Sequence, residues 1–347
     1  MLYYYCNNYG ISLITREFLP AFRVWSQALM AEMENVSYVP LKQPIVFTVE
    51  GFIITRQQGY PLFVVSLIVY AVMLLGNITV VTVIATDVKL HKPMYMMMCN
   101  LAACDLLGGT TVMAQLMSQF LTGNKTIGYV AAIVQVFCVH TYGSAVATIL
   151  SAMAYDRYIA ICQPLHYHTI MTTTRLVLLC FVAWLIPICQ VMIVVILTIG
   201  TPLCGTLIMH VYCSNHAILR LACVPTTING IYEFCSVYSI RTGCFLVIAF
   251  SYVKILQTCV IKQEKNSRSK ATQTCTSHLT IYILFEISLV IISVTYTLQD
   301  TSPNTRKFWS IFTFIVPPTV NPIIYGIAMK DIRKKIVNLS KSSVSPN

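Results

Sequence analysis

Residues 61–85 have the sequence PLFVVSLIVYAVMLLGNITVVTVIA. A helix needs about 20 consecutive apolar residues to cross the roughly 30 Å of hydrocarbon in a membrane. This stretch meets that requirement, and six later segments do so as well. The seven predicted spans are 61–85, 94–119, 129–157, 176–199, 227–259, 275–298 and 307–329. The sequence therefore predicts an all-α membrane protein, a bundle of seven transmembrane helices.

The composition also indicates a membrane protein. Of the 347 residues, 56% are hydrophobic and only 10% are charged, whereas soluble domains carry about 25% charged residues. The segments between the spans are too short for a separate soluble domain. No early stretch has the apolar core and cleavage site of a signal peptide, so we expect the first span to serve as the insertion signal. We expect a multi-pass protein of the plasma membrane.

The net charge of +11 is distributed unevenly. Four basic residues lie on one set of loops, and they are Lys125, Arg220, Arg306 and Lys307. Thirteen lie on the opposite connections and the tail, and they are Lys89, Lys92, Arg175, Lys254, Lys262, Lys265, Arg268, Lys270, Lys330, Arg333, Lys334, Lys335 and Lys341. The positive-inside rule then places the C-terminus in the cytoplasm and, with seven spans, the N-terminus outside. The basic charge indicates topology and not nucleic-acid binding.

Polar side chains inside spans are costly in hydrocarbon and are usually functional. Asn77, Asp105 and Asn321 lie in the first, second and seventh spans. They either converge on one hydrated site that holds a cation such as sodium, or make structural hydrogen bonds between helices. Pro322 removes a backbone hydrogen bond, which predicts a kink or hinge in the seventh span.

A charge pair, Asp156 and Arg157, ends the third span. A paired charge is tolerable at a membrane boundary, and an exchange of partners would give it two states. The pair is therefore either a switch or only a marker of the boundary.

Five motifs extend this pattern. They are MAYDRYIAICQPLHY (153–167), KPMYMMMCNLAACDLL (92–107), SYVKIL (251–256), KATQTCTSHL (270–279) and PPTVNPIIYG (317–326). Together they resemble the signature of the odorant receptors, a family of rhodopsin-like G-protein-coupled receptors, over about residues 35–337. Two stretches, FCVHTYG (137–143) and HYHTIMT (166–172), look more like fish odorant receptors than mammalian ones.

The resemblance implies a receptor that binds a small odorant and activates a heterotrimeric G protein of the olfactory stimulatory type. The Asp156–Arg157–Tyr158 run would then be the switch, with Asp156 holding Arg157 at rest. On activation Arg157 would turn toward the G protein, with Tyr252 and Tyr325 moving in beside it. Asn321 and Pro322 would form part of the same switch.

The resemblance also implies a role for two further regions. Trp184 would pack in the middle of the fourth helix. A short amphipathic helix after the seventh span would lie along the inner leaflet, where basic residues suit anionic lipids. Its basic residues are Lys330, Arg333, Lys334 and Lys335.

The ligand pocket is expected in the outer half of the bundle, as an apolar site with a few polar groups. His140 lies 17 residues before the arginine of the charge pair, which is about 25 Å along a helix. It either contacts the ligand or is a satisfied core residue. Gly143 and Ser144 lie one turn deeper. Glu286 is expected at the pocket floor and Ser293 further out.

Glu286 has several possible partners. It would pair with a cationic ligand, with His140 or with Arg241. Arg241 itself lies in the fifth span and needs an acid, for which Glu286 and Glu233 are the candidates. An ionisable residue at this depth suggests a polar or ionisable odorant.

The chain departs from the family at Ala132, where odorant receptors have a cysteine that bridges to the second outer loop. That loop carries Cys204, Cys213 and Cys223. The family pattern leaves Cys204–Cys223 as the expected disulfide. Cys213 is then either unpaired or joined to Cys138. Because this bridge is missing, it stays open whether the chain is a working receptor or a nonfunctional copy of one.

Three segments organise the chain. Residues 1–60 are expected outside the cell, residues 61–329 form the receptor domain, and residues 330–347 form the cytoplasmic tail. Residues 1–32 are either an upstream extension before Met33 or an ordinary disordered terminus. Asn35 and Asn124 begin glycosylation sequons.

Other function classes lack their signatures. A transporter or channel would show repeat symmetry or a polar path through the bundle, and neither is visible. An intramembrane enzyme would show a Ser/His pair, a His-Glu-x-x-His motif or paired aspartates in the spans, which do not occur. We expect no enzyme activity and no cofactor beyond the sodium ion considered above. A receptor of the same fold for a non-odour ligand remains open.

Overall fold

The computed structural model describes residues 46–261, 265–297, 302–329 and 331–336. Several predictions fall outside these residues: the sequon at Asn35, the boundary between residues 32 and 33, Lys330, and residues 337–347 of the tail.

Seven helices of the described chain are long and apolar enough to cross a membrane. They are α3 (Arg56–Thr86), α4 (Pro93–Thr122), α5 (Tyr129–Cys162), α7 (Thr173–Ile199), α9 (Thr227–Ile261), α10 (Lys265–Thr297) and α11 (Pro303–Ala328). The seven predicted spans are confirmed. The helices run further than the apolar stretches; α5 ends at Cys162, whereas its predicted span ended at residue 157. Helical hydrogen bonding therefore continues past the charge pair.

The helix ends follow local chemistry. Thr55 and Gln58 form a capping box that begins α3, and such boxes satisfy two backbone N–H groups. Thr172 accepts a hydrogen bond from the backbone of the first turn of α7. Gly123 ends α4 at φ 72°, a left-handed conformation that glycine adopts without steric cost.

Short helices occupy the connections. They are η2 (Val88–Leu90), η3 (Pro164–His166), α6 (Tyr167–Ile170) and α8 (Asn215–Leu219). A further helical turn at residues 331–336 follows α11.

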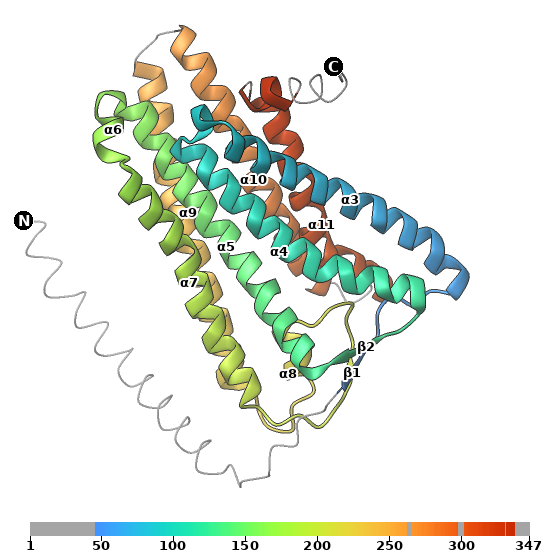
Figure 1. Cartoon of the computed structure of the whole chain (residues 1–347). Helices are drawn as coiled ribbons and strands as arrows, with labels where there is room; N and C mark the ends of the chain where they lie inside the picture. Colours follow the sequence, from blue (N-terminus) through green and yellow to red (C-terminus); the bar gives the residue numbers. More distant parts are fainter. Residues whose placement is uncertain (1–45, 262–264, 298–301, 330, 337–347) are drawn as a thin grey trace, which may run out of the picture. The chain divides into compact units, whose positions relative to one another are not determined.

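The bundle is organised around α5, which contacts α4, α7, α9 and α10 (Figure 1). On the other side, α3 packs against α4 and α11, and α10 packs against α11. Buried positions occur along most of α5, from Ala132 to Ile159. A helix buried on most faces lies at the centre of a bundle, so residues on α5 are well placed to contact several other helices.

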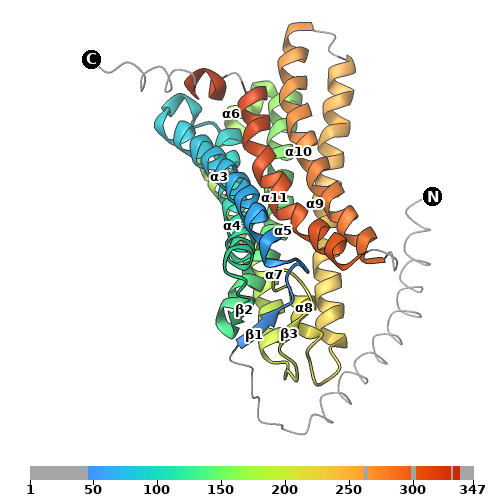
Figure 2. The ribbon, with the colours of Figure 1, turned by 90° about the vertical axis from the view of Figure 1, so that its right-hand side faces the viewer.

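A three-stranded sheet lies at one end of the bundle (Figure 2). The central strand β1 (Val46–Val49) pairs antiparallel with β2 (Thr126–Gly128) and parallel with β3 (Leu207–Ile208). Phe47 and Val49 are fully buried there. This end is called the sheet end below. These strands were not predicted from the sequence.

The segment between β1 and α3 is also tied to α11. Asn304 exchanges two hydrogen bonds of 2.9 Å with the backbone of Ile53. The Lys307 ammonium lies 2.6 Å from the Glu50 carboxylate, and the Lys307 side chain is only 5% exposed. A buried charge needs such a partner, so this contact holds Glu50 against the start of α11.

Prolines inside the helices leave backbone carbonyls without a helical partner, because proline has no N–H to offer the carbonyl four residues earlier. Pro187 in α7 frees the carbonyl of Ala183 in this way. The Thr148 hydroxyl of α5 donates to that carbonyl at 2.7 Å. A side chain from a neighbouring helix thus replaces the missing backbone bond.

The same replacement occurs at α11. Pro317 frees the carbonyl of Thr313, and the Tyr142 hydroxyl of α5 donates to it at 3.0 Å. The Tyr142 side chain is fully buried. Its ring lies so close to Gly108 of α4 that a Cβ there would come within 2.4 Å of it. Tyr142 therefore joins three helices at one point.

Candidate functional site

The charge pair of α5 forms as expected. The Arg157 guanidinium donates to Asp156 Oδ2 through Nε at 3.0 Å, and a second guanidinium nitrogen contacts the same oxygen. Tyr167 of α6 donates to Asp156 Oδ1 at 2.8 Å. Burial, together with the adjacent carboxylate, raises the pKa of the Tyr167 phenol, which keeps it a donor. Asp156 is fully buried, while the Arg157 side chain is 17% exposed.

The three tyrosines predicted beside the charge pair have different surroundings. Tyr158 packs edge-on against Phe250 of α9, with ring centroids 5.6 Å apart. Tyr325 is buried in α11, and its hydroxyl has no hydrogen-bond partner among the described residues. Tyr252 belongs to a separate network on α9. None of the three contacts the carboxylate that holds Arg157.

The Tyr252 network joins three helices. Its hydroxyl lies 2.8 Å from His278 Nδ1 and 3.0 Å from the Cys275 carbonyl oxygen. His278 Nε2 lies 2.9 Å from the Leu150 carbonyl oxygen. A carbonyl can only accept, so Nε2 carries the proton. In the neutral ring Nδ1 can then only accept, so Nδ1 and the Cys275 carbonyl oxygen share the single Tyr252 proton, and α5, α9 and α10 are linked.

Two of the three polar residues predicted to converge are in contact. Asn321 Nδ2 donates to Asp105 Oδ2 at 2.8 Å. Both side chains are 1% exposed. The other oxygens, Asp105 Oδ1 and Asn321 Oδ1, are buried and have no hydrogen-bond partner among the described residues. Such orphaned oxygens are costly unless a further group fills the space between them.

Asn77 contacts the backbone of α11 instead. Its amide donates to the Pro318 carbonyl at 2.9 Å, which is the carbonyl that Pro322 leaves without a helical partner. Gly76 permits this approach, since a Cβ there would lie 3.0 Å from the Pro322 ring. The predicted kink site is thus supported by a side chain of α3.

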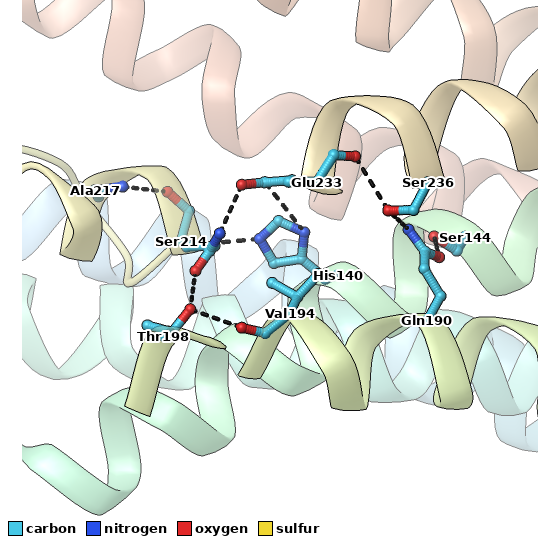
Figure 3. Close-up of polar contacts among 10 residues, drawn as sticks. His140, Ser144, Gln190, Val194, Thr198, Ser214, Ala217, Glu233 and Ser236 are labelled. Carbon is cyan, nitrogen blue, oxygen red and sulfur yellow. Dashed lines mark hydrogen bonds and ion pairs between the residues drawn. The ribbon is translucent and has the colours of Figure 1, made fainter. Parts of the chain in front are cut away.

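His140 lies in a polar cluster near the sheet end (Figure 3). His140 Nδ1 is 3.8 Å from Glu233 Oε1 on α9. The backbone N–H of Asn215 in α8 donates to His140 Nε2 at 3.3 Å. Because Nε2 accepts, the proton of a neutral ring lies on Nδ1, directed at Glu233. The Asn215 amide also donates to Glu233 Oε2 at 2.6 Å and accepts from Thr198 of α7.

Ser144 extends this cluster (Figure 3). Its hydroxyl donates to Gln190 Oε1 on α7 at 2.9 Å. Gln190 Nε2 in turn donates to Ser236 on α9 at 3.2 Å. The neighbouring Gly143 is open: a Cβ added there would meet nothing within 4 Å. The cluster therefore combines a carboxylate with several hydrogen-bonding groups, next to a glycine of α5 that no other side chain covers within 4 Å of its Cβ position.

The second predicted acid has a different partner. Glu286 Oε2 lies 3.5 Å from Arg241 Nη1, so Arg241 is the partner among the alternatives considered. Arg241 also lies 5.9 Å from the centroid of the Phe285 ring. Its side chain is 23% exposed and that of Glu286 is 31% exposed. Ser293 donates to the Leu289 carbonyl of its own helix and is exposed.

The loop cysteines follow one of the expected patterns. Cys204 and Cys223 form a disulfide with a Cα–Cα distance of 5.2 Å. Cys213 and Cys138 are both free thiols. Burial raises the pKa of the Cys213 thiol to about 12. Cys213 packs in the same apolar cluster as Ala132, the position where the family has the bridging cysteine.

A hydrogen bond holds this part of the loop. Gln135 Oε1 on α5 accepts from the backbone N–H of Cys213 at 2.7 Å. Gln135 Nε2 donates to Gln115 Oε1 and to the Thr111 carbonyl at 2.5 Å and 3.1 Å. The amide thus connects α4, α5 and the loop at the place where the disulfide is missing.

Comparison with known proteins identifies the chain. The family model described as olfactory receptor matches residues 66–342. The chain belongs to the olfactory receptor family. The human protein named Olfactory receptor 52K2 is 31% identical to it over 316 residues, 88% of this chain and 98% of that receptor. For human Olfactory receptor 52K1 the identity is 34% over 281 residues, 78% of this chain and 87% of that receptor.

A solved structure supports the fold of this olfactory receptor. The crystal structure of squid rhodopsin superposes with a TM-score of 0.68, covering 89% of this chain and 92% of that one, at 15% identity. At this identity the likeness shows the fold alone. The family makes this chain a multi-pass G-protein-coupled receptor of the plasma membrane and not an enzyme. The relatives described above are human, so the likeness to fish receptors stays a prediction.

Several uncharged residues of this olfactory receptor make contacts that were not predicted from its sequence. Gln135, Gln190 and Asn215 connect helices or hold the outer loop, and Asn100 accepts from Trp184 at 3.0 Å. For Gln135, Gln190 and Asn100 a signal was present, because amide side chains in apolar spans tend to hydrogen-bond across helices. Asn215 lies in the loop helix α8, where an amide carries no such signal.

Proposed function

We propose that this olfactory receptor detects a small polar or ionisable odorant near the sheet end of the bundle and activates a stimulatory G protein at the opposite end. The carrying observation is that the Arg241–Glu286 ion pair and the His140–Glu233 contact lie within membrane-spanning helices. Charge at this depth is expensive and is usually functional. A site that already balances charge is suited to a ligand that carries charge.

The orientation is part of the proposal. The basic residues predicted to be cytoplasmic, such as Lys89 and Lys334, lie at the end opposite the sheet. The Cys204–Cys223 disulfide connects loop residues near the sheet, and disulfides persist in oxidising surroundings. We therefore assign residues 1–60 to the outside, 61–329 to the receptor domain and 330–347 to the cytoplasm. Asn124, exposed beside β2, would then be available for glycosylation.

Ligand binding would act through exchange of partners. A ligand amine would take the place of Arg241 beside Glu286, and a ligand carboxylate would take the place of Glu286 beside Arg241. The incomplete burial of both side chains supports such an exchange, since neither is sealed from an incoming group. His140, Gly143 and Ser144 would form the α5 wall of the pocket, and Ser293 would contribute from α10.

The signal would reach the opposite end through α5. Arg157 is held by Asp156, which is itself held by Tyr167. Release of Arg157 toward a G protein would need a second set of partners, and the buried, unpartnered Tyr325 hydroxyl supplies one. Tyr252 would leave its His278 partner as α10 moves. Tyr158 and the hinge at Asn321–Pro322 would adjust with these helices.

A sodium ion would fit between α4 and α11. Asp105 Oδ1 and Asn321 Oδ1 are buried oxygens without hydrogen-bond partners in the described chain, and oxygen ligands suit hard cations. Asn77 would act indirectly, by holding the α11 backbone next to the site. Among the described residues no cluster of three His, Cys, Asp or Glu side chains suggests a transition-metal site.

A cyclic-AMP assay tests the proposed ligand class. Cells with confirmed surface delivery of the receptor are exposed to panels of acids, amines, amino acids and neutral apolar odorants. We expect a response to at least one ionisable panel, and Glu286→Gln should shift its half-maximal concentration by about tenfold to a hundredfold, because a charged contact is worth about 1.5–3 kcal/mol. Thr280→Ala on the same helix, whose exposed hydroxyl donates only to a carbonyl of its own helix among the described residues, serves as a control. A response confined to neutral apolar odorants would contradict the proposal.

A further inference from the structure

A basic cavity lies at the end of the bundle opposite the sheet. It has a volume of about 310 Å³ and lies between the α3–α4 connection and the helical turn of residues 331–336. Its charged lining is formed by the lysines Lys89, Lys92, Lys334 and Lys335 and the aspartates Asp87 and Asp331. The lysines thus outnumber the aspartates by two, four against two.

Both aspartates are already engaged. Asp87 Oδ1 accepts from the backbone N–H of Lys89 at 3.0 Å, and Asp87 Oδ2 lies 3.3 Å from Lys335 Nζ. Asp331 Oδ2 accepts from the Tyr95 hydroxyl at 3.2 Å. Within the described chain, the ammonium groups of Lys89, Lys92 and Lys334 have no carboxylate partner.

Both walls of the cavity are anchored in the apolar core, so the lysines extend from a fixed backbone. Leu90, between two of them, is 3% exposed and belongs to the main apolar core. On the other wall Ile332 is fully buried in the same core. The backbone N–H of Arg333 donates to the Met329 carbonyl at 3.0 Å. The cavity is therefore a built feature with a net positive lining.

We propose that this cavity binds the phosphorylated headgroup of an anionic membrane lipid, a phosphoinositide. Three ammonium groups without carboxylate partners suit a group with several negative charges. A volume of about 310 Å³ equals roughly ten water molecules at about 30 Å³ each, which is room for a phosphate-bearing ring and not only for a single ion. The site lies just beyond the membrane-spanning part of α3 and α4, at headgroup depth.

The orientation of the receptor decides between a lipid and a dissolved anion. With this end in the cytoplasm, the cavity faces the leaflet that carries anionic lipids, and basic pockets there bind their headgroups. This step rests on the proposed orientation, and the binding experiment below does not depend on receptor activity. The bound headgroup joins the α3–α4 connection to the turn that follows α11. It thereby restrains the end of α11 that carries Tyr325.

Lipid binding to the full receptor tests the site. The receptor is reconstituted in phosphatidylcholine nanodiscs, and a fluorescent phosphatidylinositol bisphosphate is titrated in. Each lysine near such a surface contributes about fivefold in affinity, so Lys89→Gln/Lys334→Gln should weaken binding about tenfold or more. The control Arg175→Gln/Lys254→Gln removes the same charge from α7 and α9 and should change binding less than about twofold. Equal losses in both double variants would overturn the proposal.

A gain of binding gives a readout that misfolding cannot imitate. Asp87→Asn keeps the oxygen that accepts from the Lys89 backbone but releases Lys335 from its ion pair. This variant should bind the lipid several-fold more tightly than the parent chain. Unchanged or weaker binding would count against the site.

Competition experiments distinguish a lipid headgroup from dissolved phosphate as the ligand of this cavity. Inorganic phosphate and the water-soluble inositol bisphosphate headgroup are added to the lipid-bound receptor. Weak displacement by the headgroup and none by inorganic phosphate is expected, since the acyl chains hold the lipid at the surface. Full displacement by inorganic phosphate would mean a general anion site and would refute the lipid assignment.

Discussion

His210 is a buried histidine that follows β3 at the sheet end. Its ring packs edge-on against Tyr212 at 4.4 Å between centroids, and it accepts from the Tyr212 backbone N–H at 3.4 Å. Burial, followed by the positive charge of Lys307, lowers the pKa of His210 to about 4. His210 is therefore neutral in the folded receptor near neutral pH.

This lowered pKa predicts acid sensitivity of the sheet end. An unfolded histidine has a pKa near 6.5, so between about pH 6.5 and 4 the unfolded state binds the additional proton. Stability should be full above pH 6.5 and fall as the pH is lowered through that window. Melting curves of the detergent-solubilised receptor at pH 7.5 and about 5 measure the loss. His210→Gln should reduce the pH dependence, whereas an unchanged slope would contradict this account.

Ala132 and Cys213 lead to a second prediction at this scale. Both are fully buried in one apolar cluster, so Ala132→Cys should restore the family's bridge to Cys213. Mass spectrometry after thiol alkylation would show the loss of two free thiols. Closing the loop should stabilise the receptor, by about 2–4 kcal/mol for typical disulfides. If surface delivery of the receptor remains unchanged, the missing bridge does not limit its trafficking.

At the scale of elements, the proline-freed carbonyls are the common feature of α7 and α11. Thr148, Tyr142 and Asn77 each supply a donor to a carbonyl that a proline leaves open. A buried acceptor without a donor costs about 1–3 kcal/mol. The helices are therefore held together at the points where their own backbone bonding is interrupted.

Tyr142 and Pro317 provide a direct test of this coupling. Tyr142→Phe should destabilise the receptor by about 1–3 kcal/mol, because the Thr313 carbonyl loses its donor. Pro317→Ala returns a backbone N–H to that carbonyl, so the same tyrosine change should cost much less in this background. Thermal melting of the parent receptor, the two single variants and the double variant completes this double-mutant cycle. Equal costs in both backgrounds would mean that the hydroxyl acts through something else.

The helices were predictable and the sheet was not. Each span is a long apolar stretch that signals its own existence locally. By contrast, β1 has four residues, and its partners lie near residues 127 and 207. No local pattern encodes a pairing over such separations. The same limit applies to the sites: Glu286 was recognisable as a buried acid, but its choice of Arg241 depends on how α9 and α10 lie in space.

At the scale of the whole molecule, α5 connects the proposed ligand site to the charge pair. It carries His140 near the sheet end and Arg157 at the other end, and it contacts α4, α7, α9 and α10 and, through Tyr142, α11. Its side chains also reach the prolines of α7 and α11. A displacement at the ligand site therefore has a continuous packed route to Arg157.

Arg157→Ala separates binding from signalling. The change removes the group proposed to meet the G protein but leaves the ligand site about 25 Å away along the helix. We expect the cyclic-AMP response to disappear while ligand binding to the purified receptor stays within about twofold. Arg175→Ala is a matched control at the same end. Loss of binding together with signalling would point to misfolding and not to a switch.

The sheet also has a consequence for the order of assembly. Strand β1 is synthesised before α3, but β3 is made only after α7. During synthesis β1 can pair with β2 once α3 and α4 exist, but the sheet is completed by β3 only after α5 and α7 have also been made. Contacts between distant segments form late and slowly. The sheet end should thus be the last part of this receptor to mature, and the part most in need of protection while the chain is still growing.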